Sequence, residues 1–102
     1  MLDVETPALL LDRAVMEQNL KHMAERARRL HVSLRPHIKT HKCLELGRRQ
    51  LALGAQGVTV STLFEAAAFA RGGFTDLTWA FPLDPSHVAH AQRIAQDGAT
   101  LR

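Results

Sequence analysis

Short apolar runs alternate with amphipathic stretches along almost the whole chain, at intervals of about 20 to 25 residues. The apolar runs are typical of buried strands, which we expect at 8–11, 32–36, 57–60 and 76–81. The stretches between them repeat apolar residues every three or four positions, which predicts helices at 13–30, 43–54, 62–71 and 85–97. A last apolar run at 99–102 would begin another strand. Regular alternation of this kind predicts an α/β fold with a parallel sheet covered by helices.

Local residue chemistry supports the predicted helix ends. Asp12 is a suitable N-cap for the first helix. Thr62 and Glu65 have the spacing of a capping box at the start of the third helix, and Asp84-Pro85 favours the start of the fourth. Glycines follow the predicted helix ends at Gly54, Gly72, Gly73 and Gly98.

Two architectures are compatible with these units: a doubly wound open sheet and a (β/α)8 barrel. A complete barrel needs about 250 residues. The 102 residues hold about four βα units and the start of a further strand. We therefore expect either part of a barrel or a small open sheet.

Composition limits the possible partners and compartments. Apolar residues make up 46% of the chain and charged residues 23%, which is typical of a folded domain. The net charge of +3 comes with acidic residues mixed among the basic ones of the first helix, so we expect a solvated surface and no nucleic-acid binding. Cys43 is the only cysteine, which favours a reducing compartment. No signal peptide and no apolar run near 20 residues is visible, so we expect a cytoplasmic protein without membrane contact.

The most informative segment is 34–42, Leu-Arg-Pro-His-Ile-Lys-Thr-His-Lys, at the carboxyl end of a predicted strand. That edge of a parallel sheet commonly binds ligands. Positive groups crowded together favour the neutral amine of a lysine, which is a nucleophile that forms Schiff bases. In an extended segment His37, Lys39 and His41 would point to the same side. Lys42 would start the next helix with its amine in solvent.

Two other interpretations of this segment stay open on the residue pattern alone. His37 and His41 could bind zinc, although only Cys43 lies close enough in sequence to add a ligand to these two imidazoles. The segment could also be a positively charged surface loop without chemistry.

The octapeptide Arg-Pro-His-Ile-Lys-Thr-His-Lys at 35–42 resembles the signature of the D-threonine aldolase and D-serine dehydratase family. Weaker motifs of the same family follow in the same order, at 6–12, 48–55, 58–66 and 73–76. The resemblance implies an alanine-racemase-type fold, in which a (β/α)8 barrel that binds pyridoxal 5'-phosphate (PLP) is joined to a β domain. Residues 1–102 would then be a partial, N-terminal piece of that barrel.

The resemblance also implies roles for individual residues. Lys39 would be the catalytic lysine that forms a Schiff base with PLP, and His37 and Arg35 would lie near the cofactor. The phosphate-binding loops and the metal ligands of this family come from later in its chain. We therefore expect no metal ligand here, a divalent metal only in the complete enzyme, and no activity from these residues alone.

The activity implied by the resemblance is that of a PLP-dependent lyase acting on D-3-hydroxy amino acids. Cleavage in the manner of D-threonine aldolase would yield glycine and an aldehyde. The alternatives are an ammonia-lyase similar to D-serine dehydratase, which would yield a 2-oxo acid and ammonia, and a non-catalytic remnant or interaction module. The expected partners are a small D-amino acid and, in the complete enzyme, further copies of the same chain.

Overall fold

The computed structural model describes residues 3–102. Its helices are α1 (Arg13–Arg29), α2 (Leu44–Ala52), α3 (Leu63–Arg71) and α4 (Val88–Gln96). Its strands are β1 (Val58–Val60), β2 (Asp76–Trp79) and β3 (Thr100–Leu101), and two short 3₁₀ turns are η1 (Ile38–Thr40) and η2 (Pro85–His87). The four predicted helices are therefore confirmed, with ends shifted by a few residues, and so are the strands predicted near 57–60, 76–81 and 99–102.

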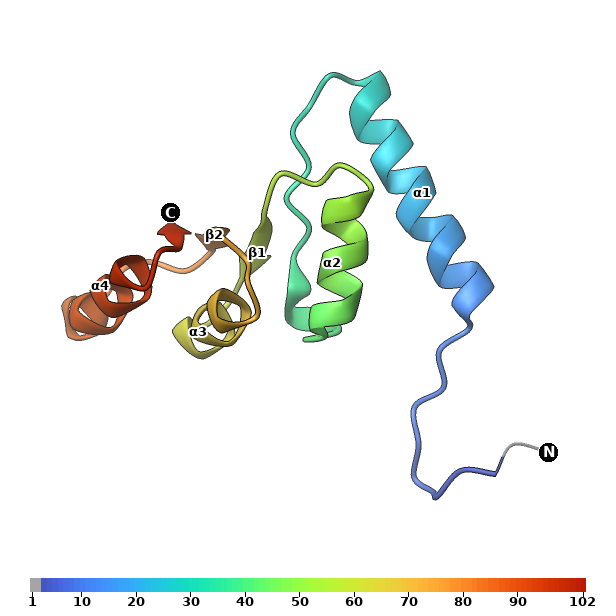
Figure 1. Cartoon of the computed structure of the whole chain (residues 1–102), viewed down its shortest axis with the longest axis horizontal. Helices are drawn as coiled ribbons and strands as arrows, with labels where there is room; N and C mark the ends of the chain where they lie inside the picture. Colours follow the sequence, from blue (N-terminus) through green and yellow to red (C-terminus); the bar gives the residue numbers. More distant parts are fainter. Residues whose placement is uncertain (1–2) are drawn as a thin grey trace.

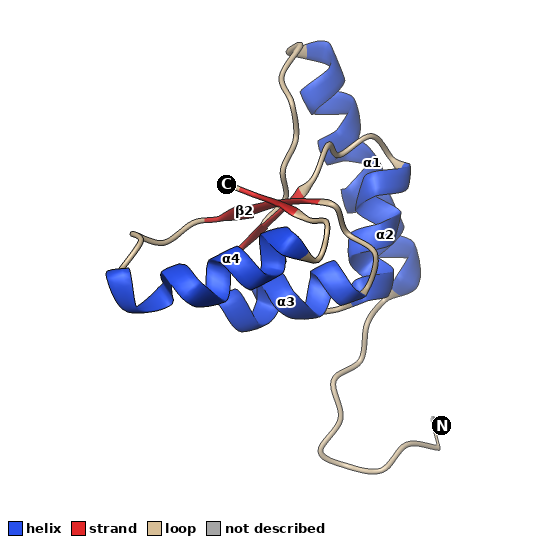
Figure 2. Ribbon diagram, turned by 60° about the vertical axis from the view of Figure 1, so that its left-hand side comes forward, coloured by secondary structure: helices blue, strands red, loops and turns tan. Residues whose placement is uncertain are grey.

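The strands form one parallel sheet in the order β1-β2-β3. Val58 pairs with Leu77, and Leu77 pairs with Leu101. A single parallel bridge between His37 and Thr59 places the segment before η1 along the free edge of β1. Figure 2 shows α3 and α4 together on one face of the strands. The predicted parallel pairing is confirmed.

Two predicted strands are wrong. Residues 8–11 form no strand; they belong to an arm that extends away from α1 (Figure 1), and Leu9 in it is 103% exposed. Apolar composition alone cannot make a strand, because the backbone needs a neighbour to pair with. Residues 32–36 run beside the start of β1, but only two backbone–backbone hydrogen bonds of the described residues join them there, from Gln56 N to Leu34 O and from Thr59 N to Pro36 O. Pro36 has no N–H to extend the ladder.

The core lies between the sheet and the helices. Val58, Val60 and Leu77 are fully buried on one face of the sheet, together with Ile38 of η1. They form one apolar cluster with side chains of α3 and α4 and with Phe74. Burying each such side chain contributes about 1.5–3 kcal/mol. Because side chains alternate along a strand, the residues between them face the other side of the sheet, which is polar.

The predicted caps are present. The Asp12 side chain accepts a hydrogen bond from Val15 N at 3.0 Å, which begins α1. Thr62 and Glu65 form a reciprocal capping box at the start of α3. Such caps contribute about 1 kcal/mol each, so the starts of α1 and α3 are determined locally. Among residues 3–102, no helix has the length and apolar character needed to cross a membrane.

Candidate functional site

A row of polar side chains crosses the face of the sheet that the helices leave open. Thr59 pairs with Thr78 on one side and with His37 on the other, so these three residues share one level of the sheet. All three are partly exposed, whereas their strand neighbours Val58 and Leu77 are buried. The chain continues from His37 directly into η1, so Lys39 follows at the carboxyl end of this polar face. The predicted placement of Lys39 at that edge is therefore present.

The turn that carries Lys39 is held at both ends. Ile38 is completely buried, which anchors the turn in the core. His37 Nδ1 accepts a hydrogen bond from Lys39 N at 3.3 Å. Ile38 O accepts from His41 N at 3.2 Å and from Lys42 N at 2.8 Å. Lys39 itself is exposed, and no carboxylate of residues 3–102 lies within ion-pair distance of its amine.

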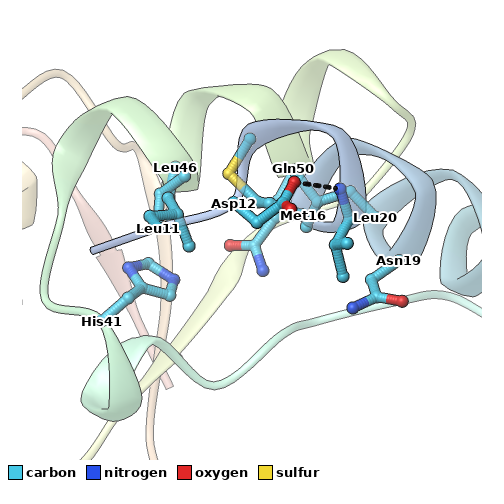
Figure 3. Close-up of a pocket in the computed structure, with 9 residues that line it drawn as sticks. Leu11, Asp12, Met16, Asn19, Leu20, His41, Leu46 and Gln50 are labelled. Carbon is cyan, nitrogen blue, oxygen red and sulfur yellow. Dashed lines mark hydrogen bonds between the residues drawn. The ribbon is translucent and has the colours of Figure 1, made fainter. Parts of the chain in front are cut away.

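The turn also separates residues that were expected to face together. A 3₁₀ turn over Ile38–Thr40 replaces the extended backbone, so His37, Lys39 and His41 lose the two-residue alternation. His41 instead lines a hollow of about 290 Å³ between α1 and α2, among the side chains labelled in Figure 3. The expectation that it points with Lys39 is therefore wrong. Within residues 3–102, no three His, Cys, Asp or Glu side chains gather as a metal ion requires.

The contacts of the His41 imidazole are with the protein itself. Its Nδ1 accepts a hydrogen bond from Cys43 N at 3.0 Å, just before α2 begins. Burial lowers the pKa of the His41 imidazole, and the neighbouring Gln50 side chain acts in the opposite direction. The buried Nε2 of His41 and Oε1 of Gln50 both lack a hydrogen-bond partner within the described residues. The neutral ring therefore fits this site better than the charged one.

Lys42 differs most from its prediction. It precedes α2, whose N-cap is Cys43, and it adopts a left-handed backbone with φ of 46°. Its Nζ lies 3.3 Å from Oε1 of Glu65, whose side chain is only 8% exposed. The side chain of Lys42 is 65% exposed, as predicted, but its amine is paired with a carboxylate, which was not predicted. The capping-box pattern identified Glu65 but not its ion-pair partner.

Glu65 is ionised in spite of its burial. Burial by itself would raise the pKa of Glu65, but hydrogen bonds from Ser61 and the nearby Lys42 ammonium outweigh it and hold the pKa below its usual value. Oε2 accepts from Ser61 N at 2.7 Å and from Ser61 Oγ at 2.9 Å. The carboxylate thus links the end of β1, the start of α3 and the turn that carries Lys39.

Arg35 lies at the opposite, amino end of the polar face, where it pairs with Asp76. Its Nη1 and Nη2 donate to the two carboxylate oxygens of Asp76 at 2.8 and 2.5 Å, and Arg102 pairs with the same carboxylate. The hydrogen bond from Arg35 and the charge of both arginines hold the pKa of Asp76 below its usual value. A Cβ on Gly57 would lie 2.5 Å from the backbone oxygen of Asp76 and 2.6 Å from Arg35 Nη1, so the close approach of the backbone here requires glycine. The ion pair gives Arg35 a structural task, and its place near a cofactor stays a prediction.

The residues present fit a PLP-binding lysine. Of the two lysines in the motif, Lys42 is paired and Lys39 is free. A free amine at the carboxyl edge of a parallel sheet, with an imidazole and hydroxyl groups close by in register, can form a covalent bond with an aldehyde.

Comparisons with known proteins identify relatives of this chain. The chain is 37% identical over 102 residues to a D-threo-3-hydroxyaspartate dehydratase of Delftia sp. (strain HT23). The matched region covers 100% of this chain and 27% of that enzyme. It is 49% identical over 74 residues to a D-threonine aldolase of Arthrobacter sp., covering 72% of this chain and 20% of the aldolase. D-serine dehydratases and 3-hydroxy-D-aspartate aldolases also match. No family model matches the sequence.

Solved structures show the same fold. The structure of the Delftia sp. HT23 dehydratase superposes with a TM-score of 0.94 at 37% identity, over 97% of this chain and 26% of that one. An alanine-racemase-like protein from Idiomarina loihiensis superposes with a TM-score of 0.89 at 35% identity, over 98% of this chain and 27% of that one. The predicted fold class is therefore confirmed. The chain belongs to the D-threonine aldolase and D-serine dehydratase family, and it spans about a quarter of the length of the curated relatives that it matches.

Proposed function

We propose that this chain carries the cofactor lysine, Lys39, of a PLP-dependent lyase that acts on D-3-hydroxy amino acids in the manner of D-threonine aldolase. The observation that supports Lys39 is the different state of the two motif lysines. Both side chains are exposed, but Lys42 pairs with buried Glu65, whereas Lys39 has no ion-pair partner among the described residues. The Lys42 amine would have to leave Glu65 before it could react with an aldehyde, whereas the Lys39 amine has no such contact to break among the described residues.

Each residue of the turn has a proposed task. Lys39 would hold the cofactor through Nζ, in a condensation with the aldehyde that releases water, and its free amine would accept or return a proton at the substrate α-carbon. His37 keeps the turn in place through the hydrogen bond to Lys39 N. When bound, PLP supplies the electron sink for bond cleavage at the α-carbon. A divalent metal is expected in the complete enzyme only.

The substrate class rests on what the relatives share. D-threonine, D-serine and 3-hydroxy-D-aspartate, which appear in the names of the matching enzymes, are all D-amino acids with a hydroxyl on the β-carbon. Retro-aldol cleavage of D-threonine yields glycine and acetaldehyde. The alternative is dehydration followed by hydrolysis, which yields 2-oxobutanoate and ammonia from the same substrate. The relative that matches the full length of this chain is a dehydratase, so this second outcome is kept.

Reductive labelling tests the lysine assignment without requiring turnover. The chain is incubated with PLP, reduced with borohydride and mapped by peptide mass spectrometry. Lysines occur at 21, 39 and 42, so three peptides report the distribution of the label. We expect the label mainly on Lys39, and its loss in Lys39→Ala but not in Lys42→Ala.

Product analysis with D-threonine, made on a complete enzyme that contains these residues, then separates the two reactions. Acetaldehyde with glycine supports the aldolase, and 2-oxobutanoate with ammonia supports the dehydratase. A label found mainly on Lys42, or spread evenly over the three lysines, would refute the assignment of Lys39. It would favour a non-catalytic remnant or interaction module.

A further inference from the structure

We propose that Glu65 and Lys42 are a positioning pair that fixes the turn presenting Lys39. This inference rests on the proposed function, because it assigns a task to residues next to the proposed cofactor lysine. Neither residue is proposed to touch the cofactor or the substrate. Their contribution is to hold η1 against the start of α3.

Glu65 makes two different sets of contacts with its two oxygens. Oε2 accepts from Ser61 N, Ser61 Oγ and Thr62 N at 2.7, 2.9 and 3.3 Å, as expected for a capping residue. Oε1 is buried and has no hydrogen-bond partner among residues 3–102, so the Lys42 ammonium at 3.3 Å is its nearest counter-charge. Helix capping alone needs only Oε2. The remaining oxygen is available for Lys42.

Contacts hold both the backbone and the side chain of Lys42. Its backbone N–H donates to Ile38 O at 2.8 Å, which closes the turn, and its side chain reaches Glu65. The left-handed φ of 46° is unfavourable for a residue with a Cβ by about 1–2 kcal/mol. Such a conformation persists only when surrounding contacts hold it. The ion pair to a side chain that is itself fixed by three hydrogen bonds provides such a contact.

The consequence concerns Lys39, which lies in the same turn. Ile38 O accepts from both His41 and Lys42, so Lys39 is enclosed between Ile38 and the residues that close the turn. Movement of Lys42 would release the turn and let the Lys39 amine sample other positions. Misplacement of a reacting group by a small distance is sufficient to slow a reaction. Glu65 would thus act on Lys39 through Lys42.

The test compares variants that separate charge, amine and capping. Lys42→Arg keeps the positive charge and removes an amine that could react with PLP. Lys42→Met removes both. Glu65→Gln keeps one carbonyl oxygen for the cap and removes the charge. Thr62→Ala is the matched control, because it deletes the hydrogen bond from Glu65 N to Thr62 Oγ1 at the same helix end without touching Lys42.

Two readouts are measured on the full chain: the rate of PLP labelling at Lys39, and hydrogen exchange of the Lys42 amide, which does not involve PLP. We expect Lys42→Met and Glu65→Gln to slow the labelling by about fivefold and to speed the exchange by a similar factor, within the range for coupled neighbours. Lys42→Arg should restore both values to within about twofold of the unaltered chain. Thr62→Ala should lower thermal stability and leave the labelling rate at Lys39 within about twofold of that of the unaltered chain.

Three results would overturn the pairing: equal labelling rates in Lys42→Met and Lys42→Arg, unchanged exchange in Glu65→Gln, or slowing by Thr62→Ala as large as that by Glu65→Gln. Failure of the proposed function looks different. In that case Lys39 takes no label in the unaltered chain, and the exchange data alone decide whether the pair holds the turn.

Discussion

Replacing Asp76 with asparagine removes the carboxylate that two arginines share. Arg35 contacts both of its oxygens, and Arg102 contacts one of them. Asparagine retains the volume and one acceptor oxygen, so the substitution tests charge rather than packing. It leaves the Arg35 guanidinium, whose side chain is only 26% exposed, without a negative partner.

The expected size of the effect lies between two limits. Removing one partner of a fully buried ion pair costs about 3–5 kcal/mol, and an exposed pair contributes about 0.2–1 kcal/mol. The side chains of Arg35 and Asp76 are 26% and 25% exposed, so we expect a loss of about 2 kcal/mol in the free energy of unfolding. For a domain of this size that corresponds to a melting temperature lower by about 10 °C.

Urea unfolding followed by circular dichroism measures this loss as a shift of the midpoint at constant slope. The control is Glu45→Gln, which breaks the exposed pair with Arg49 and should change stability by less than about 0.5 kcal/mol. The pKa of Asp76 is lowered in the fold, so its contribution is complete above the unfolded value of about 3.9 and is lost as the pH falls through the folded value. A loss no larger than that of Glu45→Gln would refute the assignment of Arg35 and Asp76 as a structural pair.

Two further predictions concern pH and self-association. Burial lowers the pKa of His41, so the free energy of unfolding should fall as the pH drops below about 6.5, the pKa of histidine in the unfolded chain. His41→Gln should flatten this part of the profile of unfolding free energy against pH. A slope between pH 7.5 and 5.5 that is the same in the variant and the unaltered chain would contradict this prediction. The exposed leucines of the arm at 9–11, with Phe64 at 81% exposure, should make the isolated chain associate or melt at low temperature. Light scattering that shows a monodisperse monomer with a cooperative melt at high temperature would refute this.

Local patterns predicted much of the fold because they depend on neighbours in sequence. Asp12 and the Thr62–Glu65 capping box determine where α1 and α3 begin, and the apolar spacing determines which faces they bury. The errors occurred where a segment depends on a distant partner. The run at 8–11 has strand composition but no strand beside it among the described residues, and Pro36 interrupts the predicted strand at 32–36.

The same distinction applies to the candidate site. The sequence by itself determined the parallel sheet and the position of the motif at the carboxyl edge of that sheet, and its resemblance to a known family selected Lys39 as the residue to test. Only the tertiary structure decided what each neighbouring cationic or imidazole side chain does: Arg35 pairs with Asp76, Lys42 pairs with Glu65, and His41 lies between α1 and α2. These partners are far away in the chain, so no local spacing encodes them. Charges and imidazoles are placed by long-range packing, which brings each one to the group that offsets its desolvation.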